Sequence, residues 1–210
     1  MSRLGHWVAL PIRLVRGVVT EVRGLAEFAI IMWPSTPLGY LMRGAYWHRM
    51  TGAKDILVAR GARMSSCEFI RFGERLAIGE NVEFIADGVD GLGVYIGSNI
   101  LFARGVYLRS SNHVLADLDQ HIRDQGHTSK RVTFAGSDYA IVIEDECWIG
   151  ANVIIVSGAH IGKGAVVGAG SVVTGAIPDY AIAAGVPARV IGDRRHSKTT
   201  SPDAMRDNHS

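Results

Sequence analysis

The residue best suited to chemistry in this sequence is His113, which ends the segment Arg109–His113. An ordinary histidine titrates near ~6.5, so a neutral imidazole can accept a proton from an alcohol at physiological pH. The polar residues that follow lack the regular pattern found on either side of them. Long irregular segments inside regular folds are commonly functional. We therefore interpret His113 as a candidate general base, the alternative being a loop histidine that only forms hydrogen bonds.

The elements that position His113 are predicted from a period of six in the apolar residues. The recurring β-branched residues are Ile143, Ile149, Ile155, Ile161, Val167 and Val173. Four positions after each of them stand Cys147, Val153, Ala159, Ala165, Ser171 and Ile177. A period of six is neither the 3.6 of a helix nor the alternation of a strand. It predicts a hexapeptide β-solenoid, whose stacked repeats bury one continuous core.

The repeat also predicts a loop. Ile78 and Ile96 are eighteen residues apart, which is three repeats. A triangular coil returns to the same face after three repeats, so we expect these two side chains to stack directly. The register is lost at His113 and resumes at Ile143. The predicted fold is all-β, a parallel solenoid with a loop, residues 113–142, extruded from it.

Histidine and cysteine spacing argues against a metal site. His121 and His127 lie in the loop, and His160 occupies an outward-facing position of a later repeat. The spacing from His113 to His160 is 47 residues, which is not a multiple of eighteen, so the two do not recur on matching coil positions. Neither cysteine belongs to a CxxC pair, which predicts reduced thiols in a reducing compartment. We expect no metal.

The solenoid is flanked by segments of different character. Residues 1–50 are predicted to form an N-terminal helical segment, interrupted by Pro34 and Pro37. Residues 51–192 are predicted to form the solenoid domain. Residues 193–210 are polar and poor in apolar side chains, which predicts a disordered tail.

Net charge and the distribution of charged residues limit the kinds of partner that the protein is expected to bind. A net charge of +2 gives no reason to expect a nucleic-acid partner. Arginines and glutamates interrupt the N-terminal helix before any apolar run approaches the ~20 residues of a membrane span. We favour packing of this helix on its own solenoid or on a neighbouring subunit. The alternative is peripheral contact with the inner face of a membrane.

Three blocks near the C-terminus resemble one family. They are Cys147–Val153, Val167–Thr174 and Ala184–Gly192. In this order they resemble the C-terminal motifs of the hexapeptide-repeat acyltransferases, and more narrowly the bacterial sugar and polysaccharide O-acetyltransferases. The resemblance spans about residues 72–192. It implies a left-handed parallel β-helix, against the usual right-handed crossover, assembled as a homotrimer in the cytoplasm.

The resemblance also implies site residues. Acetyl-CoA, the co-substrate, would lie in a groove between two subunits. His113 stands at the position of the family's catalytic histidine, which ends a repeat just before the loop. By family position, Trp148 would flank the pantetheine arm, and Ala151 and Ala169 would offer it backbone contacts. The nucleotide end would lie near Thr174 and Arg189; from the residues alone, Arg189 is equally well an ordinary surface cation.

The acceptor is less well defined by the resemblance. The asparagine that holds the sugar in small-sugar enzymes falls near Glu83 or Ile85, neither of which is equivalent. We expect the acceptor, a sugar or glycan, to be contacted by Glu83, Asn112 and His127. The long loop and helical leader favour a cell-envelope polysaccharide or its precursor. The alternatives are a nucleotide-linked amino sugar, an antibiotic or a natural product as acceptor, or a non-catalytic trimeric scaffold.

Overall fold

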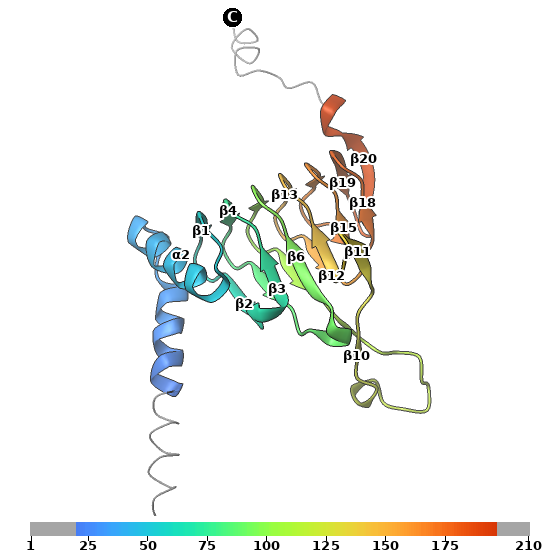
Figure 1. Ribbon diagram of the computed structural model, residues 1–210, viewed down its shortest axis with the longest axis horizontal. Coiled ribbons are helices and arrows are strands. Elements are labelled where there is room, and N and C mark those ends of the chain that lie inside the picture. Colours follow the sequence, from blue (N-terminus) through green and yellow to red (C-terminus); the bar gives the residue numbers. More distant parts are fainter. Residues whose placement is uncertain (1–19, 197–210) are drawn as a thin grey trace, which may run out of the picture.

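The computed structural model describes residues 20–196, which form a left-handed parallel β-helix with three faces, capped by helices (Figure 1). The fold class predicted from the period of six is confirmed. The seven-stranded sheet contains β1 (Ile56–Val58), β4 (Leu76–Ile78), β7 (Leu101–Phe102), β13 (Trp148–Ile149), β16 (Val166–Val167), β19 (Ala181–Ala184) and β20 (Arg189–Asp193). The five-stranded sheet contains β2 (Arg63–Ser65), β5 (Glu83–Ile85), β8 (Tyr107–Arg109), β14 (Ile154–Val156) and β17 (Val172–Val173). The six-stranded sheet contains β3 (Ile70–Phe72), β6 (Gly93–Ile96), β11 (Val132–Phe134), β12 (Ser137–Ile143), β15 (His160–Ile161) and β18 (Ala176–Ile177).

The core is a set of side-chain ladders that run along the inside of the three sheets. The six β-branched residues of the repeat are each 1% exposed or less: Ile143, Ile149, Ile155, Ile161, Val167 and Val173. Parallel pairing places each of them beside its equivalent in the next coil, as Ile143 is beside Ile161. The interior is therefore filled, and chemistry is confined to the outer surface and the corners.

The predicted stacking of Ile78 on Ile96 is wrong. Ile78 pairs with Phe102, and Ile96 pairs with Phe72 on one side and Ile143 on the other. The physical reason is an insertion between Phe84 and Ile96, which makes this coil longer than eighteen residues, so equal sequence spacing no longer means the same face.

Three successive coils carry their extra residues at one corner, between the five-stranded and six-stranded sheets. We call it the insertion corner. The inserted segments contain η1 (Cys67–Phe69), then η2 (Val89–Gly91), and then the long loop between β8 and β12. Figure 1 shows this loop projecting from the solenoid beside β10 (His127–Thr128). The loop is shorter than residues 113–142, because β12 pairs with β6 from Tyr139 onward and Ile141 is already buried.

The predicted terminal segments are described only in part. Residues 20–32 are helical, and α2 (Pro37–Thr51) follows the proline break, with Pro37 at its first turn. Residues 1–19 and 197–210 lie outside the described residues. The predicted disordered tail begins inside an ordered element, because β20 continues to Asp193 and η4 (Arg194–His196) follows it. No helix among residues 20–196 is long and apolar enough to cross a membrane.

The first coil is closed by α2. Trp47 is 1% exposed and meets the rings of Phe72 and Phe84 edge-on at 6.1 Å each. Arg43 is fully buried, and its guanidinium donates to the carbonyls of Val58 at 2.8 Å and Trp33 at 2.6 Å. This cation therefore ties the end of the preceding helix and α2 to the first strand.

The turn between the seven-stranded and five-stranded sheets depends on left-handed backbone. Gly105 (φ 69°) and Asn152 (φ 55°) occupy it in successive coils. A Cβ on Gly105 would collide with Oδ1 of Asn152. Glycine is thus favoured here by the left-handed backbone, which Asn152 also adopts, and by the Asn152 side chain that stacks on it from the next coil.

We expect Gly105→Ala to lower the free energy of unfolding by about 1 to 3 kcal/mol, because it combines left-handed strain with this collision. Gly175→Ala is the matched control: a Cβ there meets no atom within 4 Å, and its backbone is not left-handed. Urea unfolding followed by circular dichroism measures both variants. Equal stability of the two would contradict this account of the corner.

Candidate active site

His113 lies on the insertion corner, at the end of β9 (Asn112–His113). This strand pairs antiparallel with β10, and His113 stands opposite His127. The two imidazole rings have centroids 4.3 Å apart and planes inclined by 37°. Both residues are exposed, so a solvent-borne hydroxyl has access to the ring. Asn112 is exposed beside His113 and pairs with Thr128, so the structure brings together His113, Asn112 and His127 of the predicted site.

The start of the loop is held by Asp87. Ser110 and Ser111 are fully buried, and their hydroxyls donate to the Asp87 carboxylate at 2.7 and 2.5 Å. The Asp87 amide donates in return to the Ser110 hydroxyl at 3.2 Å. These bonds join two inserted segments directly before β9. The position of His113 is thereby fixed from the preceding coil.

Opposing effects act on the Asp87 carboxyl. Burial raises its pKa, but hydrogen bonds from Ser111, Ser110 and the Asp87 backbone, together with the charge of Arg109, outweigh burial. The net result is a pKa below the ordinary value for aspartate. The carboxylate that holds the loop is therefore ionised at neutral pH.

The returning arm of the loop is fixed to three coils. Oδ2 of Asp90 in η2 accepts a hydrogen bond from the Ser129 amide at 3.0 Å. The Ser129 hydroxyl donates to the Ser110 carbonyl at 2.8 Å, and the Lys130 amide donates to the Ser157 hydroxyl at 2.6 Å. The loop is thus anchored on both sides of the β9–β10 pair.

His160 has a structural setting. Its Nε2 lies 2.7 Å from Oε1 of Glu144, and its ring meets Phe134 of β11 edge-on at 5.8 Å. Phe134 also contacts the ring of Tyr95, with centroids 5.0 Å apart. His160 therefore helps to hold β11 against the six-stranded sheet. No group of three or more potential metal-ligating histidine, cysteine or acidic residues exists among residues 20–196.

The residues predicted to bind acetyl-CoA gather elsewhere. Trp148 is 51% exposed on the outer side of the seven-stranded sheet, between Leu101 and Val166 of the neighbouring coils. Ala151 and Ala169 follow at the next corner, where the Gly170 amide donates to the Ala151 carbonyl at 2.8 Å. These three predicted residues lie around one corner, where the small side chains of Ala151 and Ala169 leave the backbone accessible.

The other predicted positions are more scattered. Thr174 is exposed at the insertion corner, two coils beyond the long loop, and Arg189 is exposed at the start of β20. Glu83 lies on the outer side of the five-stranded sheet between Arg63 and Tyr107, and no hydrogen bond or ion pair within residues 20–196 joins it to β9. The five-stranded sheet separates the corner of His113 from that of Ala151. The structure of one chain therefore does not bring the predicted base together with Trp148, Ala151 and Ala169.

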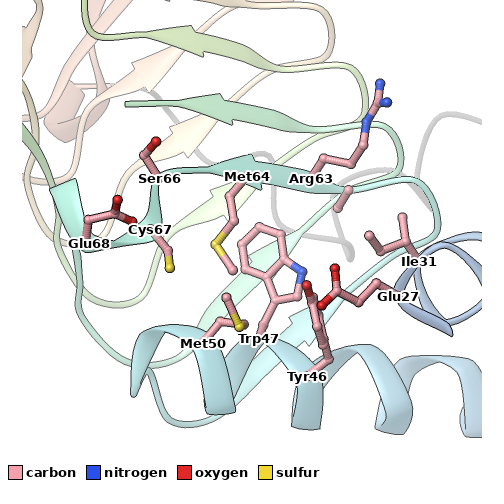
Figure 2. Close-up of a pocket in the computed structure, with 11 residues that line it drawn as sticks. Glu27, Ile31, Tyr46, Trp47, Met50, Arg63, Met64, Ser66, Cys67 and Glu68 are labelled. Atoms are coloured by element: carbon pink, nitrogen blue, oxygen red, sulfur yellow. The ribbon is translucent and has the colours of Figure 1, made fainter. Parts of the chain in front are cut away.

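A separate cavity lies at the first coil, far along the chain from the loop. It has a volume of about 410 Å³ and is lined by the helices and by β2 and η1 (Figure 2). Tyr46, Met64 and Cys67 are among its lining residues, and none of the predicted site residues is. Its surroundings offer no reason to place the chemistry of His113 there.

Cys147 fills a small space in the core, as expected from its place in the repeat. It is 2% exposed, and burial raises the pKa of its thiol to about 12. A thiol that is protonated throughout the physiological range is a poor nucleophile.

Residues 140–175 match the family model described as bacterial transferase hexapeptide (six repeats). This part of the chain carries the hexapeptide repeat. The predicted resemblance to the hexapeptide-repeat acyltransferases is confirmed.

Known proteins support the same assignment. The galactoside O-acetyltransferase of Escherichia coli is 36% identical over 125 residues, which are 59% of this chain and 56% of that protein. The solved structure of a maltose O-acetyltransferase from Clostridium difficile is 27% identical, with a TM-score of 0.60, covering 83% of this chain and 87% of that one. The hexapeptide-repeat acetyltransferase VCA0836 of Vibrio cholerae, solved in complex with acetyl-CoA, is 26% identical, with a TM-score of 0.61, covering 81% of this chain and 84% of that one. The chain spans 38% to 56% of the length of the first four curated relatives that it matches.

Asp87 and Asp90 were not predicted as site residues. Both lie in the insertion between Phe84 and Ile96, and both bind the long loop. The sequence does carry one signal for them: the coil that contains Asp87 and Asp90 is six residues longer than a regular coil, which indicates an insertion at the same corner as the loop. Sequence spacing alone did not show that the two insertions stack.

We expect Asp87→Asn to lower the free energy of unfolding at pH 7 by about 1 to 3 kcal/mol, because two hydrogen bonds to a charged acceptor are weakened. A carboxyl whose pKa is lower in the folded state stabilises it above the unfolded pKa, and this contribution is lost as pH falls through the folded pKa. The difference between wild type and variant should therefore shrink below about pH 4.

Urea unfolding at pH 7 and in acid measures this difference. Asp119→Asn is the matched control, because its exposed carboxylate accepts no hydrogen bond from residues 20–196. A stability gap for Asp87→Asn that is independent of pH would contradict the ionic role.

Proposed function

We propose that this protein is an acetyl-CoA-dependent O-acetyltransferase that acetylates a sugar hydroxyl, with His113 as general base. The observation that carries the proposal is the placement of an exposed histidine at the mouth of the one long loop that interrupts the described solenoid. The relatives named as sugar O-acetyltransferases and the neighbour bound to acetyl-CoA support the reaction type and the donor.

The reaction needs only one proton carrier. His113 takes the proton of the acceptor hydroxyl while its oxygen attacks the thioester carbonyl carbon, giving a tetrahedral oxyanion. Collapse of this intermediate breaks the carbon–sulfur bond, and the imidazolium returns the proton to the departing thiolate of CoA. Both substrates bind together, so no acyl-enzyme forms, in keeping with the raised pKa of the buried Cys147 thiol.

The split site supports a homotrimer. In our proposal Trp148, Ala151 and Ala169 of one subunit line the acetyl-CoA groove beside His113 of its neighbour, and Thr174 and Arg189 lie toward the nucleotide. An apolar stripe on the outer side of the seven-stranded sheet supports such packing. It includes Leu57, Leu101 and Trp148, which are 52%, 47% and 51% exposed in a single chain.

We expect Leu101→Glu to reduce the trimer population, because it places a charge in the middle of this stripe. Light scattering after size exclusion should give three times 22.7 kDa for the wild type and a smaller mass for the variant. Leu118→Glu is the control, since Leu118 is 94% exposed in the loop and lies off the stripe. A wild-type mass of one chain would overturn the trimer.

For the acceptor we propose a cell-envelope polysaccharide or its precursor, contacted by Asn112 and Glu83, with the reaction in the cytoplasm where acetyl-CoA is supplied. Helix 20–32 leaves Val22, Leu25 and Phe28 more than half exposed, a surface suited to a neighbouring subunit or to the inner face of a membrane. It meets its own solenoid in its C-terminal half, where Glu27 and Ile31 line the first-coil cavity and the Ile31 carbonyl accepts a hydrogen bond from the Gly61 amide. The alternatives are a nucleotide-linked amino sugar, an antibiotic or another natural product as acceptor.

We expect His113→Ala to lower the transfer rate by a factor of about 10² to 10⁴, because it removes the imidazole that takes the proton of the acceptor hydroxyl. CoA release with a panel of sugar, glycan and amino-sugar acceptors measures it. His121→Ala removes an imidazole from the same loop and should leave the rate unchanged. Full activity of His113→Ala would overturn the assignment of the base. The scaffold alternative predicts no transfer and no thermal stabilisation by acetyl-CoA.

A further inference from the structure

The imidazole of His113 lacks the partner that usually orients a catalytic base. General-base histidines commonly donate one ring nitrogen to a carboxylate or a backbone carbonyl, which fixes the ring. Within residues 20–196, no hydrogen bond or ion pair reaches the His113 ring. The ring is also exposed, so core packing does not fix it either.

One side chain does contact this ring. His127 stands directly opposite His113 across the antiparallel pair, with ring centroids 4.3 Å apart and an inclination of 37°. Side chains in this relation restrict one another, because each ring occupies the space into which the other would rotate. His127 is therefore placed to limit the orientations available to the His113 ring.

The backbone that carries His127 is itself held. The Ser129 amide and the Thr128 hydroxyl donate to Oδ2 of Asp90 at 3.0 and 3.5 Å. At the other end of β10, the Gly126 carbonyl accepts from the Val114 amide at 3.1 Å. A ring on a fixed strand can orient its partner, whereas a ring on a loose loop could not.

We propose that His127 is a positioning residue for His113: its ring face, and not a ring nitrogen, holds the base in the orientation that accepts the proton. This inference rests on the proposed function for its catalytic consequence. It gives His127 a role that acts through His113, in place of the acceptor contact expected from its position in the loop.

Two substitutions at His127 distinguish the effect of its ring face from the effect of its ring nitrogens. His127→Ala removes the stacked surface and should lower kcat about tenfold, with little change in KM for acetyl-CoA or for the acceptor. His127→Phe keeps a flat ring on the strand and should restore most of kcat. If His127→Phe is as impaired as His127→Ala, or raises the acceptor KM, a nitrogen contact is responsible and the proposal is overturned.

A double variant tests whether His127 acts through His113. Once the base is gone, its orientation no longer matters, so His113→Ala and the double variant His113→Ala/His127→Ala should have the same residual rate. A further tenfold loss in the double variant would contradict positioning. His121→Ala serves as the control for loss of a loop imidazole, and circular dichroism with thermal unfolding establishes that each variant is folded.

A measurement that does not depend on catalysis distinguishes failure of this proposal from failure of the proposed function. Side-chain NMR of the intact protein, labelled at histidine, should show a ring-current shift of the His113 ring protons that disappears in His127→Ala and persists in His127→Phe. Unchanged His113 signals in His127→Ala would overturn the stacking. If the stacking is seen but His113→Ala remains active, the assignment of the base fails and the orientation of the ring by His127 stands.

Discussion

The structure depends on one constraint: the inward-facing side chains of neighbouring coils must stay in register. Each coil contributes one apolar residue to each inner ladder, and the pairing of Ile143 with Ile161 and of Ile149 with Val167 is interrupted by no inserted residue. A shift by one residue would turn the buried ladder outward. Any additional sequence must therefore leave the solenoid at a corner.

That constraint explains how a regular fold holds an irregular site. Three successive coils carry their extra residues at the insertion corner, and each inserted segment contacts the next. Asp87 binds the first residues of the long loop, and Asp90 binds the arm that returns from it. His113 lies between these contacts, so the solenoid holds the backbone of a strand that lies outside it.

The sequence predicted the parts that follow from periodicity. The ladder from Ile143 to Val173, the helix over residues 37–51 and the interruption after His113 all result from local patterns, and the structure contains them. It did not predict which coils were lengthened, so the stacking of Ile78 on Ile96 was wrong, and the anchoring role of Asp87 was missed. Contacts between insertions depend on which corner each occupies, and residues such as Asp87 and Ser111 carry no periodic signal that would relate them.

The direction of β20, the last strand of the solenoid, affects whether further molecules can stack on its end. A parallel solenoid ends in open strand edges, onto which a further coil, or another molecule, could add. β20 runs antiparallel to β19, so the last strand of the seven-stranded sheet runs opposite to the strands of the preceding coils. At the other end, α2 packs against β1, with Arg43 bonded to the Val58 carbonyl. The antiparallel β20 interrupts the parallel stacking at one end and α2 covers β1 at the other, and both oppose extension of a self-complementary repeat into a fibre.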